Sequence, residues 1–148
     1  MSLPDQERAT RRSVPAAAAL LGYAGLIPFL GLAAALAADV NVSLASPLFT
    51  TYSAVILSFL GGIRWGVYAG AAEPKDRDLW ISIAVSLAAW AALALPAGTV
   101  VTALLGGHLA TAFVDQLTPP AGQQPWLKSL RWRLSAGAIA GHLVVLFA

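Results

Sequence analysis

Three ionisable side chains lie inside stretches of the sequence that are otherwise apolar. Arg64 stands within Gly61-Gly62-Ile63-Arg64-Trp65-Gly66, His108 lies in a later apolar stretch, and Asp115 follows it after seven residues. Seven residues are about two helical turns, so His108 and Asp115 share one helix face. A charged group inside lipid is costly and is usually paired, which makes Asp115 the natural partner of Arg64. Arg64, His108 and Asp115 form a candidate intramembrane polar site.

Two interpretations of this site stay open. In the first, Arg64 and Asp115 form a buried ion pair, and a proton relay runs through His108, Asp115 and Arg64. In the second, Arg64 reaches the lipid headgroups beside Trp65, and His108 only bonds a neighbouring helix. We place His142 at a shallower depth than His108, so we do not expect the two to share a metal ion.

Small residues recur every four positions around Arg64, and a second pair occurs near the end of the chain. In a helix such residues line one face and let another backbone approach closely in lipid. This pattern predicts a docking face for a partner protein or lipid, or packing against the chain's own helices. The residues are Ala54, Ser58, Gly62, Gly66 and Gly70, with the second pair Gly137 and Gly141.

Several familiar site chemistries are missing from the sequence. It has no cysteine, which excludes disulfides, thiolate metal sites and cysteine nucleophiles. It contains no HExxH, GxSxG or Walker motif and no paired carboxylates. We therefore predict no catalytic residue, no metal site and no cofactor, and we favour a protein that is not an enzyme. An intramembrane enzyme would need polar groups that converge on a cavity near His108.

The composition is that of a membrane protein. Of the 148 residues, 58% are hydrophobic and only 11% are charged, whereas soluble domains carry roughly 25% charged residues. The net charge of +2 does not indicate nucleic-acid binding, because the basic residues flank hydrophobic spans.

The apolar stretches predict an all-α bundle of about five transmembrane helices. About 20 apolar residues suffice to cross the hydrocarbon core. Pro28 should kink the first span and free a carbonyl near Ala24, and residues 126–133 read as an interfacial elbow before the last helix. We expect a flexible basic segment at 1–14 and a single membrane domain at 15–148. The predicted spans are 15–38, 48–70, 79–95, 99–116 and 131–148.

The basic residues predict the orientation. All nine Lys and Arg residues fall on one side of the membrane if five helices alternate. Cytoplasmic loops are enriched in Lys and Arg, so the N-terminus is predicted to be cytoplasmic and the C-terminus periplasmic.

Two stretches carry a family resemblance: residues 21–29 (LGYAGLIPF) and 52–66 (YSAVILSFLGGIRWG), supported by Leu130-Arg131 before the final helix. With these the sequence resembles the transmembrane protein 69 family, catalogued in bacteria as domain of unknown function 3429. The resemblance runs from about Pro15 onward. It implies a small multi-helix protein of bacterial inner membranes, and it implies no activity.

Two functions of different classes follow. The first is an accessory or assembly subunit that docks onto a larger respiratory or photosynthetic membrane complex, or onto itself, through its small-residue faces. The second is a small-solute or proton transporter or channel that acts as an oligomer and uses Arg64, His108 and Asp115. Both place the protein in contact with the lipid bilayer of the inner membrane.

Overall fold

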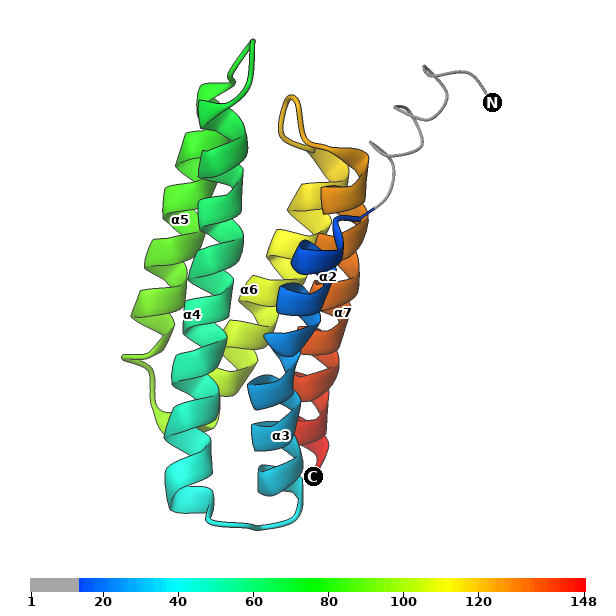
Figure 1. Cartoon of the computed structure of the whole chain (residues 1–148). Coiled ribbons are helices and arrows are strands. Elements are labelled where there is room, and N and C mark those ends of the chain that lie inside the picture. The colour runs from blue at the N-terminus through cyan, green and yellow to red at the C-terminus, as the bar shows by residue number, and fades with distance from the viewer. Residues whose placement is uncertain (1–13) are drawn as a thin grey trace.

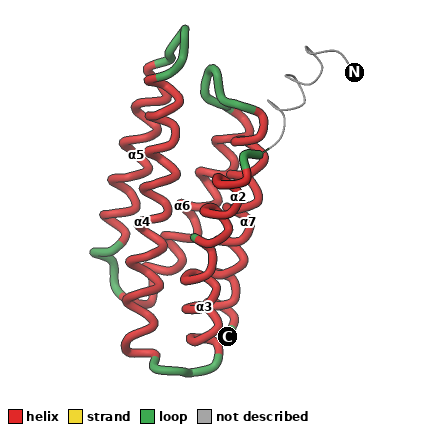
Figure 2. The backbone as a smooth tube through the Cα atoms, in the orientation of Figure 1, coloured by secondary structure: helices red, strands yellow, loops and turns green. Residues whose placement is uncertain are grey.

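The computed structural model describes residues 14–148, which form a bundle of long helices running up and down (Figure 1). The predicted flexible segment, apart from Val14, lies outside these residues. No strand occurs in the part described, where loops only join the helices (Figure 2). The helices are α2 (Ala16–Ala24), α3 (Leu26–Ala37), α4 (Val42–Ala69), α5 (Asp76–Ala92), α6 (Ala97–Leu117) and α7 (Pro125–Phe147).

The prediction of an all-α membrane bundle is confirmed. Within residues 14–148, four segments are long and apolar enough to cross a membrane: Ala16–Ala37, which is α2 with α3, and the helices α4, α6 and α7. Helix α5 has 17 residues, about 26 Å at 1.5 Å per residue, slightly less than the roughly 30 Å of a hydrocarbon core. Many large apolar side chains point outward, such as Leu20 and Trp90, as expected where lipid is the solvent.

The first span is interrupted at Gly25, three residues before Pro28. Proline has no N–H, so it cannot complete the bond to the carbonyl four residues earlier, but it is tolerated in a first helical turn. Pro28 accordingly stands in the first turn of α3. At the interruption, the carbonyl of Gly25 accepts a hydrogen bond from the hydroxyl of Tyr52 on α4, at 2.8 Å.

Helices α4, α5, α6 and α7 all begin before the predicted spans, and the difference is largest, six residues, for α4 and α7. Helix α4 starts at Val42 and contains Pro47, which lies just before the predicted span 48–70. The carbonyl that Pro47 leaves free belongs to exposed Ser43, near the helix start, where water can satisfy it. Helix α7 starts at Pro125, because proline at the first helical position loses no bond. Residues 126–133 are therefore its first two turns and not a separate elbow.

Two apolar clusters hold the bundle together. One lies between α4, α5 and α6 and includes Leu57, Ala89 and Leu104. The other lies between α3, α4 and α7 and includes Phe29, Phe49 and Ala138. Small side chains in both clusters let the helices approach closely in lipid.

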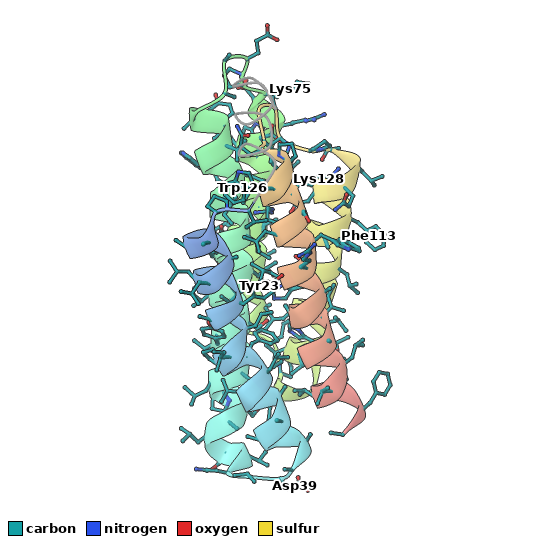
Figure 3. The ribbon with its side chains drawn as sticks, turned by 45° about the vertical axis from the view of Figure 1, so that its right-hand side comes forward. Tyr23, Asp39, Lys75, Phe113, Trp126 and Lys128 are labelled. Atoms are coloured by element: carbon teal, nitrogen blue, oxygen red, sulfur yellow. The ribbon has the colours of Figure 1, made fainter. Side chains whose placement is uncertain are left out.

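The two ends of the bundle differ in charge. Lys75, between α4 and α5, and Lys128, at the start of α7, lie at one end, and Asp39, between α3 and α4, lies at the other (Figure 3). The chain enters α2 at the end with the lysines and finishes α7 toward the opposite end (Figure 1).

Candidate functional site

Arg64 is buried and fully engaged at its terminal nitrogens. Its Nη1 donates to Oδ1 of Asp115 at 2.9 Å, and its Nη2 donates to Oδ1 of Asp78 at 2.5 Å. Nη2 also donates to the carbonyl of Thr118 at 2.7 Å. With a side chain only 1% exposed, Arg64 faces the bundle interior and does not extend to the headgroups.

Asp115 receives a second arginine from α7. Nε of Arg131 donates to its Oδ2 at 2.9 Å, and Nη2 of Arg131 donates to the same oxygen. Nη1 of Arg131 donates to the carbonyl of Leu60 on α4 at 2.9 Å. Asp115 therefore lies between two guanidinium groups, and each of its carboxylate oxygens accepts from a different arginine.

The four groups form one chain of alternating charge, Asp78–Arg64–Asp115–Arg131, which we call the charged network. It joins α5, α4, α6 and α7 in that order. Two cations and two anions cancel, and the four residues are between 1% and 5% exposed. Charged groups can be buried when they are paired and hydrogen-bonded. The network has no net charge and links four helices.

Sequence reasoning found the Arg64–Asp115 pair and missed the two outer members. Asp78 falls outside the predicted spans, one residue before 79–95, but it lies in the first turn of α5, where a carboxylate is favoured by the helix dipole. Arg131 was assigned to an interfacial elbow, but it lies in the second turn of α7. The sequence did contain one signal for them. Each lies within a few residues of an apolar stretch, close enough to be buried in the first turns of a helix.

A second polar cluster lies among apolar rings in the bundle interior. Oγ of Ser53 is 3.2 Å from Nε2 of His108 and 3.0 Å from Nε2 of His142. The three residues have no exposed surface. Phe29 and Phe49 pack against the imidazoles, with the ring centroids of Phe29 and His142 5.2 Å apart.

In this cluster the donor and the acceptor of each hydrogen bond can be assigned. Nδ1 of His142 is 2.9 Å from the carbonyl of Ala138, so it carries a proton and donates. In a neutral imidazole Nε2 is then an acceptor, and Ser53 must donate to it. Ser53 in turn accepts from Nε2 of His108, which leaves Nδ1 of His108 without a hydrogen-bond partner among the described residues.

The expected depth of His142 was wrong. The two imidazole centroids are 5.1 Å apart and both rings contact Ser53, so the two histidines are direct neighbours in the bundle interior. The α5–α6 connection lies nearer the middle of the bundle than the α3–α4 loop does (Figure 1), so counting residues from the helix ends misplaced the histidines relative to each other. No group of three or more metal-ligating His, Cys, Asp or Glu side chains occurs within residues 14–148.

The small-residue face of α4 divides into a packed part and an open part. Ala54 is buried, and the carbonyl of Ser58 accepts from Ser86 on α5 at 3.4 Å. A Cβ atom added at Gly62 or Gly66 would meet no atom within 4 Å. Each four-residue step turns about 40° past a full helical turn, so the row rotates from the core to the outside.

The other predicted small residues differ in their surroundings. Gly70 meets only backbone atoms of its own helix, whereas a Cβ at Gly137 or Gly141 would lie 2.7 Å from Leu26 or Phe29 of α3. The closest α4–α5 approach is at Gly61, where a Cβ would lie 2.8 Å from the carbonyl oxygen of Ser82. The α7 pair thus serves packing within the chain, and Gly62 with Gly66 forms an open glycine face.

An apolar groove of about 630 Å³, which we call the α2–α4 groove, opens between α2, α4 and α7. Arg64, His108 and Asp115 do not line it. Its lining includes Ala18, Gly22, Tyr52, Ile56, Trp126 and Leu134.

Comparison with known proteins gives one family and one relative. Residues 14–147 match a family described as protein of unknown function (DUF3429). The chain is 33% identical over 141 residues to transmembrane protein 69 of Xenopus tropicalis, covering 86% of this chain. It spans about half of that relative, 53% of its length. No solved structure matches the chain significantly.

Proposed function

This chain belongs to the DUF3429 family, and we propose that it is a non-enzymatic accessory or assembly subunit that docks onto a larger membrane complex. The proposed location is a bacterial inner membrane, and the proposed hosts are respiratory or photosynthetic complexes. The observation that carries the proposal is the open glycine face of α4.

The open glycine face has the features of a helix-docking surface. Gly62 and Gly66 are four residues apart, the spacing at which small residues let two transmembrane helices approach closely. Val55 and Phe59, which also line the α2–α4 groove, continue the same stripe of α4 and are 57% and 63% exposed. A partner helix would find two open glycines flanked by apolar side chains that it can pack against.

The state of the ionisable groups also supports a docking role. The charged network is neutral and buried, so its groups are committed to holding helices together. Of these groups only Arg131 lines the α2–α4 groove, and its guanidinium is bound to Asp115, whereas Arg64, His108 and Asp115 do not line it. A transporter or an enzyme would instead bring such groups to an accessible cavity.

The test is recovery of a partner under mild detergent. We expect Gly62→Leu and Gly66→Leu to abolish stoichiometric co-purification of the complex while the chain itself folds normally, because space for the new side chains is open. Gly31→Leu on α3 and Gly106→Leu on α6 are matched controls, since both are exposed glycines with nothing within 4 Å of an added Cβ. Gly61→Leu should prevent folding.

The outcomes separate the proposal from its alternatives. Recovery of the wild-type chain as a lone monomer would contradict it, as would normal assembly of both Gly62 and Gly66 variants. Loss of assembly in the Gly31 and Gly106 controls as well would show that the effect is not specific to the α4 face. A homo-oligomer that the Gly62 variant disrupts would assign the same face to self-association.

A proton or small-solute transporter is the second candidate, favoured by one observation. Ser53 links His108 to His142, and Nδ1 of His108 is free to accept a proton. Such a chain of hydrogen bonds can pass a proton along. Proton flux into liposomes that hold the protein should then fall on Ser53→Ala, and unchanged flux would discard this candidate.

A further inference from the structure

The α2–α4 groove has the depth of one leaflet of the bilayer. Along α7 its lining runs from Trp126 to Ala138, twelve residues, or about 18 Å. A hydrocarbon core of roughly 30 Å gives each leaflet about half that thickness. The groove therefore begins near the end that carries Lys75 and Lys128 and stops near the level of Phe29.

The interruption at Gly25 explains why the groove stops there. Below it, α3 packs on α4, and the ring of Phe29 lies 4.9 Å from that of Phe49, with Phe29 only 1% exposed. Above it, Ala18, Leu21 and Gly22 of α2 line the open groove. A transmembrane partner helix would need a contact surface along the whole membrane thickness, and this groove offers half of it.

We infer that the α2–α4 groove binds one acyl chain of an anionic phospholipid from the leaflet next to the charged loops. Apart from the indole N–H of Trp126 at one end, the lining holds two polar side chains, and both are already engaged: Tyr52 donates to Gly25, and Arg131 donates to Asp115. The groove thus fits hydrocarbon and offers nothing to a polar headgroup along its length.

Charge at this end of the bundle selects the headgroup. Lys128 and Arg133 do not line the groove, but they are the sequence neighbours of Leu127 and Leu134, which do. Arg64 and Arg131 are neutralised inside the network, but Lys128 and Arg133, on the first turns of α7, have no carboxylate within 4.0 Å among residues 14–148. Trp126 lines the groove at the same end, and tryptophan is enriched at the headgroup level. An anionic headgroup would therefore meet uncompensated positive charge.

The experiment blocks the groove with a bulky side chain and measures how much phospholipid the protein retains. The protein is reconstituted in vesicles of phosphatidylethanolamine and phosphatidylglycerol, extracted in mild detergent, and analysed by intact mass spectrometry for retained phospholipid. Ile56→Trp places a bulky ring in the groove, and Ile83→Trp on α5, at an exposed position outside the groove, is the matched control. We expect one retained phosphatidylglycerol per chain, reduced about tenfold or more by Ile56→Trp and unchanged by Ile83→Trp.

Three results would overturn the inference: no retained phospholipid, equal retention in the two tryptophan variants, or retention without preference for the anionic lipid. A photo-crosslinking residue at position 56 adds an independent readout. Capture of phospholipid there supports the inference, and capture of a polypeptide overturns it. The Gly62→Leu variant should keep its lipid, so failure of the docking proposal and failure of this inference are distinguishable.

Discussion

Asp115 is the residue on which the charged network depends most. It accepts from Arg64 through one carboxylate oxygen and from Arg131 through the other. The remaining anion, Asp78, contacts Arg64 at 2.5 Å. Without Asp115, Arg131 would keep only its bond to the carbonyl of Leu60. Each arginine is tolerated in the interior because a carboxylate faces it.

Asp115→Asn should destabilise the bundle strongly. Removing one partner of a buried ion pair leaves an uncompensated charge, which costs about 3–5 kcal/mol in folded proteins. Denaturant-induced unfolding in detergent micelles measures the change. Asp76→Asn, an exposed carboxylate at the start of α5, is the control and should change stability little.

The double variant Asp115→Asn with Arg131→Met shows whether charge imbalance is the cause. It removes one anion and one cation, so it should recover much of the lost stability. An Asp115→Asn protein as stable as the wild type would contradict a structural role for the network.

Sequence reasoning reached one contact of the polar site because its two residues lie inside apolar stretches. Asp78 lies one residue before the predicted span 79–95, and Arg131 is the first residue of the predicted span 131–148. Both lie among other charged residues, where nothing in the sequence separates a buried charge from a solvated one. His142 was misplaced because depth was counted from helix ends. The relative height of two helices depends on their packing, which one sequence does not contain.

At the scale of elements, the junction of α2 and α3 is the most informative feature. Pro28 and Gly25 interrupt the first span, and the hydroxyl of Tyr52 on α4 donates a hydrogen bond to the Gly25 carbonyl. In lipid no water is present to compete for such a group. This one bond fixes the point at which α2 departs from α4, and hence the closed end of the α2–α4 groove.

Tyr52→Phe should therefore loosen α2 more than any other helix. Hydrogen bonds inside membrane proteins are worth about 0.6 kcal/mol on average, so global stability should change little. Amide hydrogen exchange over Ala16–Ala24 in nanodiscs should become faster. Tyr23→Phe is the matched control, because Tyr23 is 44% exposed. Equal exchange in the two variants would show that the Tyr52 bond does not hold the junction.

Apolar length and proline were good guides to the helices and poor guides to their ends. The all-α bundle and the interruption near Pro28 were predictable. The predicted spans 48–70 and 131–148 left out Pro47 and Pro125, yet both lie within helices. Pro125 is at the first position of α7, where proline is tolerated, and Pro47 in α4 frees only the carbonyl of exposed Ser43. The four-residue spacing on α4 was also read as one face, whereas helical rotation carries Gly62 and Gly66 away from Ala54. Only packing partners identify Gly61 as the contact glycine.

At the scale of the whole molecule, the described basic side chains gather at one end. Lys75 and Lys128 mark that end, and Asp39 marks the other (Figure 3). Arg64 and Arg131 are neutralised by the network. The positive charges that remain at this end and can determine the topology are Lys75, Arg77, Lys128 and Arg133. The bias in Lys and Arg sets orientation, so this end is predicted to be cytoplasmic.

Cysteine labelling can establish the orientation, because the sequence contains no cysteine and any introduced thiol is unique. Val40→Cys lies in the α3–α4 loop at a position that is 58% exposed, and Glu73→Cys lies in the exposed loop between α4 and α5. In intact cells with a permeable outer membrane, a membrane-impermeant maleimide should label position 40 and not position 73. After the inner membrane is broken, both should react. The reverse pattern would show that the positive end faces outward, and labelling of both positions in intact cells would show that the chain does not hold one orientation.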